Sequence, residues 1–224
     1  MRATVVVPVY NEAPVLGSIL TEVKEIKGGY SVVVVDDGST DGSGDIARKA
    51  GATVVRHRYN LGLGAALATG LAAAKRLGTH AAVTFDADGQ HKVSDLMAVL
   101  APVLDGKADV VIGTRLRNPK GMPITRQLLN RLANYFTWFL FGVWTTDSQS
   151  GLRAFSRHAL SAVDLRTHRM EASTELFGEI RKHGLRFAEV PITPIYTEYS
   201  KAKGQRAGNS ASIVWKLLLR KLRG

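Results

Sequence analysis

The chain has 224 residues, of which 45% are hydrophobic, and a formal net charge of +11. This length and composition predict a globular protein with one large domain, or with one domain and a short appendage. The sequence contains no cysteine, which excludes disulfides, thiolate metal sites and thiol catalysis and fits a reducing compartment.

The N-terminal residues lead directly into an apolar strand, so we expect no signal peptide at this end of the chain. No uninterrupted apolar run approaches the roughly 20 residues that a membrane-spanning helix needs. The sequence therefore predicts that the chain does not cross a membrane by itself.

The positive charge is concentrated in the second half of the chain. Residues 1–110 contain 11 Lys/Arg and 12 Asp/Glu, a net charge of −1, whereas residues 111–224 contain 19 Lys/Arg and 7 Asp/Glu, a net charge of +12. This asymmetry suggests a polyanion, an anionic membrane face or a phosphorylated acceptor as a partner. A solvated basic surface is the alternative.

Strands and helices alternate through the first half of the sequence. Apolar runs predict strands at residues 4–9, 31–35, 53–57, 81–85 and 109–113. Asn11 is expected to cap a helix that runs to about residue 27, and further helices are expected at 45–50, before residue 77 and at 94–104. Because the valine runs lack polar alternation, we expect strands that are covered on both faces. The predicted fold is an open, mostly parallel α/β sheet flanked by helices.

The second half contains two apolar helices whose surroundings the sequence leaves open. The first spans residues 123–144 and is rich in aromatic residues, and the second follows Ser210 to residue 223 with a basic opposite face. Both have the pattern of helices that lie in a membrane interface, although each could instead pack on protein. An edge strand is expected at 189–192, and a polar, basic loop at 196–206.

Asp86 and Asp88 follow the predicted strand 81–85, at the sheet edge where ligands collect. Their spacing puts both side chains on one side of an extended segment, where a divalent cation could bridge them to a diphosphate. The alternative is a strand-to-loop turn in which both residues cap backbone N–H groups.

Other strand ends also carry polar or glycine-rich loops. Asp37 follows the second strand and suits a nucleoside base or ribose, and Gly62 begins a helix whose N-terminus attracts anions. Turn formation and close packing are the alternatives for these two residues. Leu67 occupies the position of the third glycine of a dinucleotide-binding fingerprint, and the sequence has no phosphate-binding P-loop. Hydride transfer and P-loop phosphoryl transfer are therefore disfavoured.

Five ordered motifs make the chain resemble family 2 glycosyltransferases, and most of all the dolichyl-phosphate or polyprenyl-phosphate mannose or glucose synthases. They are Val-Pro-Val-Tyr-Asn-Glu at 7–12, Val-Asp-Asp-Gly-Ser-Thr-Asp at 35–41, Asn-Leu-Gly at 60–62, Asp-Ala-Asp-Gly-Gln at 86–90 and Ser-Gly-Leu-Arg-Ala-Phe at 150–155. The resemblance covers about residues 4–200. It implies a GT-A fold and a nucleotide-sugar donor.

The resemblance also implies roles for individual residues. It assigns one set of residues to the donor nucleotide sugar and a second set, which shares two members with the first, to the metal, Mg²⁺ or Mn²⁺. The nucleotide-sugar set comprises Pro8, Tyr10, Glu12, Asp37, Gly62, Asp86, Ala87 and Asp88, and the metal set comprises Asp86, Asp88 and Gln90.

For the acceptor phosphate, the resemblance points to Arg115 and Arg126, whose guanidinium forks suit phosphate oxygens. The chain departs from the family here: the intervening loop lacks the usual Gly-Gly, and Asn130 stands where a serine is common. Lys203 and Arg206 are further candidates for acceptor or diphosphate contacts. Asp147 could act as a base, orient sugar hydroxyls or orient the arginines, or merely form a turn.

The resulting hypothesis is a metal-dependent, inverting transfer of mannose or glucose from GDP-mannose or UDP-glucose to a polyprenyl phosphate. Residues 1–205 would form the catalytic domain and residues 206–224 a basic amphipathic helix, placed peripherally on the cytoplasmic face of a membrane, with a possible anchoring partner. The alternatives are a family 2 transferase acting on a sugar or polysaccharide hydroxyl with Asp147 as base, and a basic nucleic-acid-binding module. We expect no nucleic-acid partner, because no binding motif for it is visible.

Overall fold

A computed structural model describes residues 3–26, 28–117, 119, 121–167 and 171–195 of the chain. The predicted loop at 196–206, with Lys203 and Arg206, and the predicted helix after Ser210 lie outside these residues. None of the helices in the described part is long and apolar enough to cross a membrane.

The described residues form one seven-stranded sheet with the strand order β3-β2-β1-β4-β6-β5-β7. Every neighbouring pair is parallel except those made by β6, which runs antiparallel to both β4 and β5. The strands are β1 (Ala3–Val9), β2 (Ser31–Asp36), β3 (Thr53–Arg56), β4 (Ala81–Thr84), β5 (Val110–Thr114), β6 (Arg153–Ser156) and β7 (Phe187–Pro191). The expected mostly parallel α/β sheet is thus confirmed, with β7 at its edge.

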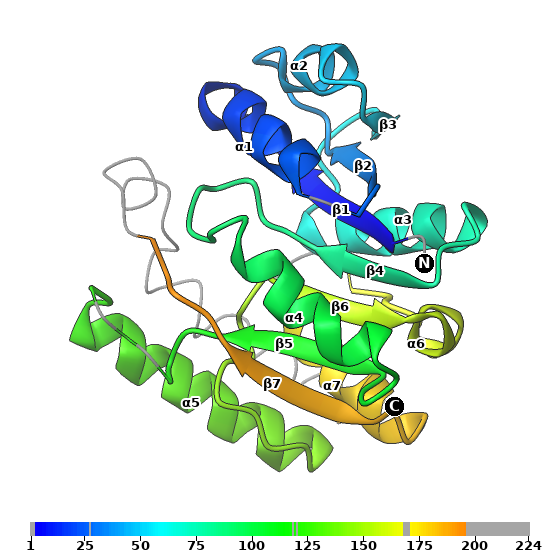
Figure 1. Cartoon of the computed structure of the whole chain (residues 1–224). Helices are drawn as coiled ribbons and strands as arrows, with labels where there is room; N and C mark the ends of the chain where they lie inside the picture. Colours follow the sequence, from blue (N-terminus) through cyan, green and yellow to red (C-terminus); the bar gives the residue numbers. More distant parts are fainter. Residues whose placement is uncertain (1–2, 27, 118, 120, 168–170, 196–224) are drawn as a thin grey trace.

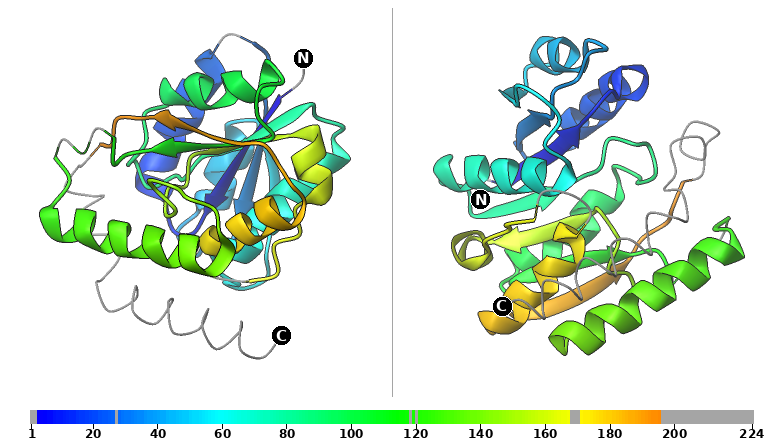
Figure 2. Two further views of the ribbon diagram at one scale, coloured as in Figure 1. Left: turned by 90° about the horizontal axis from the view of Figure 1, so that it is seen from below. Right: turned by 180° about the vertical axis from the view of Figure 1, so that it is seen from behind.

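Helices cover both faces of the sheet (Figures 1 and 2). α1, α2 and α4 share one hydrophobic core, whereas α3, α6 and α7 belong to the core on the opposite face. α5 packs against α7 instead of lying on the sheet. The helices are α1 (Ala13–Glu25), α2 (Ser43–Lys49), α3 (Leu63–Arg76), α4 (Asp95–Leu104), α5 (Ile124–Phe141), α6 (Arg157–Ala162) and α7 (Ala172–Lys182).

The valine run of β1 explains why it occupies the middle of the sheet. All seven residues of the strand are buried. Val5 and Val7 belong to the core under α1 and α4, whereas Val6 belongs to the core under α3. Alternate side chains of a strand point to opposite faces, so an unbroken apolar run requires cover on both sides.

Several expected helix boundaries were wrong. α2 begins two residues and ends one residue earlier than expected, and two other differences concern α1 and α5. The N-cap of α1 is Glu12; Asn11 has a φ of 54°, and its side-chain oxygen accepts a hydrogen bond from Thr40 N at 2.9 Å. α5 ends at Phe141 because Gly142 adopts a left-handed conformation with a φ of 69°. Trp144 therefore lies beyond the helix. β6, α6 and α7 were not predicted.

Candidate functional site

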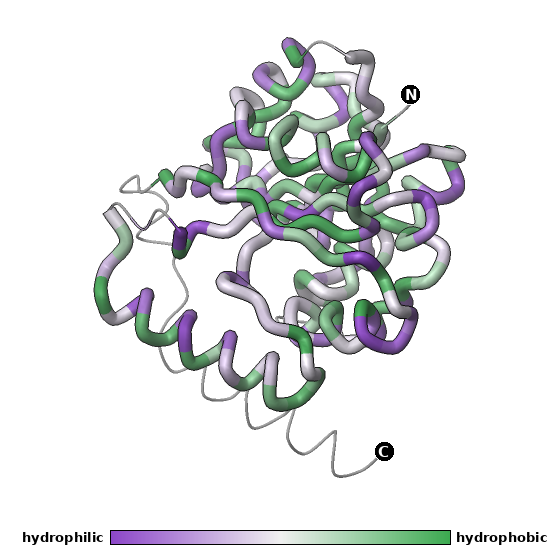
Figure 3. Tube along the Cα trace, turned by 60° about the horizontal axis from the view of Figure 1, so that its bottom comes forward, coloured by the Kyte–Doolittle hydropathy of each residue, from purple (hydrophilic) through white to green (hydrophobic). Residues whose placement is uncertain are grey.

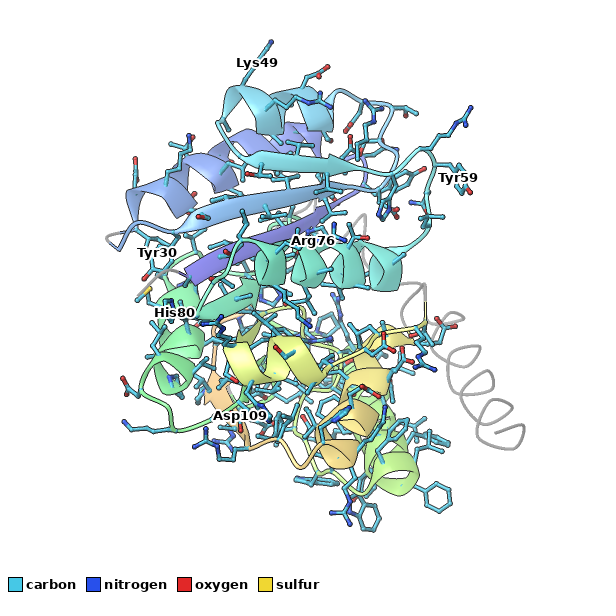
Figure 4. The ribbon with its side chains drawn as sticks, turned by 90° about the vertical axis from the view of Figure 1, so that its right-hand side faces the viewer. Tyr30, Lys49, Tyr59, Arg76, His80 and Asp109 are labelled. Carbon is cyan, nitrogen blue, oxygen red and sulfur yellow. The ribbon has the colours of Figure 1, made fainter. Side chains whose placement is uncertain are left out.

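The loops that follow the parallel strands share one edge of the sheet. Tyr30, His80 and Asp109 precede β2, β4 and β5 and lie at one end of the sheet, whereas Tyr59 follows β3 and lies at the other (Figure 4). β1 pairs with β2 on one side and with β4 on the other. The chain adds β2 and β3 on one side of β1 and then places β4 on its other side. A crevice for ligands is expected at such a switch point, beyond the carboxyl ends of β1 and β4.

The loops after β1 and β2 are held together by backbone-to-side-chain hydrogen bonds. The backbone N–H groups of Asn11 and Glu12 donate to the hydroxyls of Ser39 and Ser43, each at 3.0 Å. Ala13 N donates to Asp41 at 2.9 Å. The N–H groups at the start of α1 are therefore satisfied by the neighbouring loop.

These hydrogen bonds fix the loop after β1, which carries three residues of the predicted nucleoside site. Pro8 is buried within β1, Glu12 is nearly buried and Tyr10 is 46% exposed at the strand end. Tyr10 thus presents a ring at the edge where a base could stack. Nucleoside binding by these residues stays a prediction.

Asp37 and Gly62, which were predicted as separate parts of the nucleotide site, contact each other. The Asp37 carboxylate accepts hydrogen bonds from Leu61 N at 2.9 Å and from Gly62 N at 2.8 Å. It also lies 2.7 Å from Nδ1 of His57, whose Nε2 is 3.0 Å from Thr69 on α3. An internal carboxylate therefore occupies the approach to the N-terminus of α3, where the sequence suggested room for a ligand anion.

Asp86 lies just beyond β4 in a space that depends on a glycine. Asp86 is partly buried, and its Oδ1 is buried with no hydrogen-bond partner among the described residues. A Cβ atom on Gly151 would stand 1.7 Å from Asp86 Oδ2. Thr84 fixes the same loop by donating to Gly151 O at 2.8 Å. The glycine at this position therefore makes room for the carboxylate.

Asp88 accepts hydrogen bonds from the backbone N of Gln90 at 2.9 Å and from its side-chain Nε2 at 2.7 Å. Burial and the nearby charge of Asp86 raise the pKa of Asp88 to about 7. Burial also raises the pKa of Asp86, although Arg153 and Arg115 oppose this effect. Two adjacent, partly buried carboxylates repel one another when ionised, and a cation between them would offset that repulsion.

These features fit a divalent cation held by two carboxylates. No larger cluster of His, Cys, Asp or Glu suited to a metal occurs among the described residues, so the other ligands would come from a bound diphosphate or from water. The Gln90 side-chain oxygen accepts from Arg126 Nη2 at 3.1 Å, and its role as a metal ligand stays a prediction.

Arg115 and Asp147 form a buried ion pair that connects the end of β5 to the loop before β6. The Nε and Nη2 atoms of Arg115 donate to the two carboxylate oxygens at 2.7 and 2.8 Å, and the Arg115 backbone N donates at 3.0 Å. Burial alone would raise the pKa of Asp147, but the charge and hydrogen bonds of Arg115 more than offset this, so that the pKa is lowered. Asp147 therefore orients an arginine and is a poor proton acceptor.

The same loop is held from two other directions. Glu189 on β7 accepts from Thr146 N at 2.6 Å and from the Thr145 hydroxyl at 2.7 Å. Asn134 on α5 donates to Thr146 O at 2.7 Å and accepts from Ser148 N at 2.9 Å. The position of Asp147 is consequently set by β5, β7 and α5 together.

Arg126 and Asn130 bring the inner side of α5 into this site. Arg126 reaches Gln90 in the loop that carries Asp88, and Asn130, one turn further along, is buried with no partner for its Nδ2 among the described residues. Acceptor binding by these two residues and by Arg115 stays a prediction. Arg126 contacts the loop that follows β4, and the charge of Arg115 acts on Asp86 and Asp88 in the same loop.

Two further residues belong to the site and were not predicted. Arg153 is buried on β6, donates to Ser150 O at 2.6 Å and interacts electrostatically with Asp86. His91 is buried, and burial together with the charge of Arg115 lowers its pKa to about 3, so it is neutral. An arginine inside the apolar run 152–155 was the available signal for Arg153, because a buried charge needs an internal counter-charge.

Comparisons with known proteins agree with this geometry. Residues 4–164 match the family model described as glycosyl transferase family 2. The chain is 35% identical to a UDP-N-acetylglucosamine–dolichyl-phosphate N-acetylglucosaminyltransferase of Methanococcus voltae, over 97% of this chain and 95% of that protein. It is 32% identical to a polyprenol monophosphomannose synthase of Mycolicibacterium smegmatis, over 93% and 82% of the two chains.

A solved structure supports the fold. The chain superposes with a TM-score of 0.74 on glucosyl-3-phosphoglycerate synthase from Mycobacterium tuberculosis, crystallised with Mn²⁺, UDP and phosphoglyceric acid. The two chains are 21% identical, and the match covers 98% of this chain and 78% of the other. The expected GT-A-type fold is therefore confirmed.

Proposed function

The chain belongs to glycosyl transferase family 2, and from this premise we propose that it transfers a sugar from a nucleoside diphosphate sugar to a polyprenyl phosphate. One relative named above is a dolichyl-phosphate transferase and the other is a polyprenol monophosphomannose synthase. Both names support a polyprenyl phosphate as the acceptor. Mannose from GDP-mannose and glucose from UDP-glucose remain the donors that the sequence suggested. The name of the Methanococcus voltae relative adds a third candidate donor, UDP-N-acetylglucosamine.

The observation that carries the proposal is a group of buried polar atoms that lack hydrogen-bond partners in the part of the chain that the structure describes. Asp86 Oδ1, His91 Nδ1, Asn130 Nδ2 and Ser150 Oγ belong to this group. Their segments meet, because Asp86 contacts Gly151 and the α5 side chain Arg126 contacts Gln90. Each such atom costs about 1–3 kcal/mol, and a bound ligand is one explanation for such a concentration.

Asp86 and Asp88 are the residues that would hold Mg²⁺ or Mn²⁺, which supplies positive charge against the negative charge of the departing nucleoside diphosphate. The loops after β1 and β2 would hold the nucleoside between Tyr10, Glu12 and the segment that Asp37 fixes. Ala87 would lie along the nucleotide as a backbone contact, and Gly62, whose N–H donates to Asp37, would hold that carboxylate in place. These assignments are proposals that extend the positions given above.

On the acceptor side, Arg115 and Arg126 would offset and orient the lipid phosphate. An oxygen of that phosphate attacks the anomeric carbon from the side opposite the diphosphate. The new carbon–oxygen bond forms as the bond to the diphosphate breaks, which inverts the anomeric configuration. A phosphate oxygen is already anionic at pH 7, so no base is required. Asp147 holds Arg115 in place and neutralises part of its charge.

Transfer onto a sugar hydroxyl, the alternative in which Asp147 is the base, is not favoured by this geometry. A hydroxyl nucleophile requires a proton acceptor, and Asp147 is occupied by three hydrogen bonds from Arg115. The lowered pKa of Asp147 weakens it further as a base.

The proposal is tested with radiolabelled GDP-mannose, UDP-glucose and UDP-N-acetylglucosamine, each with a polyprenyl phosphate, with phosphoglyceric acid or with no acceptor, in Mn²⁺. We expect organic-extractable label from one donor only with the lipid acceptor, and loss of that label in EDTA. Label transferred only to phosphoglyceric acid, or donor hydrolysis without lipid product, would overturn the acceptor assignment. Full activity in EDTA would overturn the metal assignment.

A lipid acceptor would place the enzyme at a membrane surface. We propose peripheral association with the cytoplasmic face, where nucleotide sugars are available, with or without an anchoring partner. The net charge of +12 over residues 111–224 supports an anionic surface as the partner.

A further inference from the structure

α5 has the reverse of the usual arrangement of polar and apolar residues. Of the four residues of α5 that are buried, Asn130, Asn134 and Thr137 are polar and Leu140 is apolar. Its exposed residues are mostly large and apolar, although Thr125 and Arg131 are exposed as well. Hydrophobic and hydrophilic stretches alternate along the helix (Figure 3). A helix on a protein in water normally buries its apolar stripe and exposes its polar one.

Six exposed apolar residues of α5 and of the segment after it form a surface that we call the outer α5 face. Its members are 50–82% exposed although they are large and hydrophobic. They are Ile124, Leu128, Leu132, Tyr135, Trp138 and Trp144. Exposed apolar patches that contain several large side chains usually mark an interaction site.

The composition of this face indicates which partner it fits. Trp144 contacts the rings of Tyr135 and Trp138, with centroids 5.6 and 6.4 Å apart. α5 carries no acidic residue, and its Arg131 is exposed, whereas Arg126 contacts Gln90 on the inner side. Tryptophan and tyrosine concentrate where a bilayer meets water, and arginine complements anionic headgroups.

We propose that the outer α5 face docks on an anionic lipid bilayer. α5 would lie in the plane of the membrane interface, with Leu128 and Leu132 among the acyl chains and the aromatic cluster at headgroup level. This docking role rests on the proposed function, because it assigns the surface on which the lipid acceptor is met. It deepens that function by naming the face.

The position of α5 explains how docking would serve the site. Arg126 and Asn130 are on the inner side of the same helix whose outer side would touch lipid. A helix with its side chains is about 10 Å across, so a lipid phosphate would have to rise only about that distance to reach them. Neither a second copy of the chain nor residues 196–224, the other possible occupants of this face, would place the acceptor there.

The test uses the full chain with Trp215→Phe, which leaves Trp138 and Trp144 as the only tryptophans. Vesicles of phosphatidylcholine and phosphatidylglycerol carrying brominated acyl chains should quench the emission of both. Flotation with the same vesicles measures binding, which should weaken as salt is raised. Leu128→Glu with Leu132→Glu should weaken binding at least about tenfold.

The matched control is Leu77→Glu, because Leu77 is 47% exposed at the end of α3, away from α5. It should bind vesicles like the parent protein, and thermal unfolding should show that all variants fold. Vesicle binding that the Leu128 and Leu132 changes leave intact would overturn the proposal. So would a dimer in solution that these changes dissociate without any vesicle binding, or unquenched tryptophan emission in protein that floats with vesicles.

Failure of this proposal can be told from failure of the proposed function. The vesicle assays need neither donor nor acceptor. With a short, water-soluble prenyl phosphate, the Leu128→Glu, Leu132→Glu variant should keep parental transfer activity, whereas its activity on a long-chain acceptor in vesicles should fall with binding. No transfer to any prenyl phosphate, together with intact docking, would refute the proposed function alone.

Discussion

Replacing Asp147 with asparagine is expected to destabilise the protein strongly, because Arg115 would then bury its charge without the carboxylate that offsets it. The side chains are 6% and 0% exposed, and the two charged groups meet at 2.7 and 2.8 Å. Removing one partner of a buried ion pair costs about 3–5 kcal/mol. At about 2–4 °C per kcal/mol for a protein of this size, the Tm should fall by roughly 6–20 °C.

The assay is thermal and urea unfolding, with Asp105→Asn as the control. Asp105 also pairs with a cation, Lys107 at 2.9 Å, but its side chain is 54% exposed. Loss of that exposed pair should change the free energy of unfolding by less than about 1 kcal/mol. An Asp147→Asn protein with the parental Tm would refute the reasoning that the pair is buried and coupled.

A double variant separates stability from function. Arg115→Met with Asp147→Leu replaces the ion pair with apolar groups of similar size, an exchange that is often neutral or stabilising. We expect near-parental stability and loss of transfer to a polyprenyl phosphate. Parental transfer by this variant would show that Arg115 does not bind the acceptor.

Three further outcomes are expected. Mn²⁺ with a nucleoside diphosphate should raise the Tm of the parent protein, because ligand at a hundredfold excess over Kd adds about 2.7 kcal/mol to the free energy of unfolding. EDTA should reverse the shift in Tm, and Asp88→Asn should abolish it. Gly151→Ala should lower transfer about a hundredfold, because its Cβ would stand 1.7 Å from Asp86 Oδ2; parental kcat in a folded variant would contradict this. The hydrogen bonds from Arg186 lower the pKa of Asp109 to about 2 from 3.8, so the stability that this carboxylate adds is present above about pH 4 and is lost as the pH falls toward 2. Thermal unfolding of Asp109→Asn across this range should show a Tm deficit at pH 6 that disappears near pH 2.

The sequence predicts the parallel half of the sheet well and its antiparallel strand poorly, for physical reasons. The valine runs of β1 and β2 are long and unbroken, which only a doubly covered strand tolerates. β6 has four residues and begins with a buried arginine, so its apolar signal is weak. Its antiparallel direction depends on pairing with β4 and β5, which lie far from it in the sequence.

For the site, the sequence identifies many of the residues but not which of them are paired with the protein itself. Asp37 is bound by the N–H groups of Leu61 and Gly62, which are 24 and 25 positions away. No local pattern encodes such a contact, because it forms only when two loops meet at the edge of the sheet. The reversed polarity of α5 is hidden for a similar reason: periodicity shows that a helix has two faces, but not which of them the fold covers.

The carboxylates at this end of the sheet differ in how far the protein compensates their negative charge. The carboxylates of Asp41 and Asp147 are satisfied by protein donors, and each has a lowered pKa although burial acts to raise it. Burial raises the pKa of both Asp86 and Asp88, and the charge of Asp86 raises that of Asp88 further, so that the cations near them are outweighed. Protein donors thus satisfy Asp41 and Asp147, whereas Asp86 and Asp88 keep too little positive charge near them. A divalent cation bound with a diphosphate, as proposed above, would supply the missing positive charge beside these two residues.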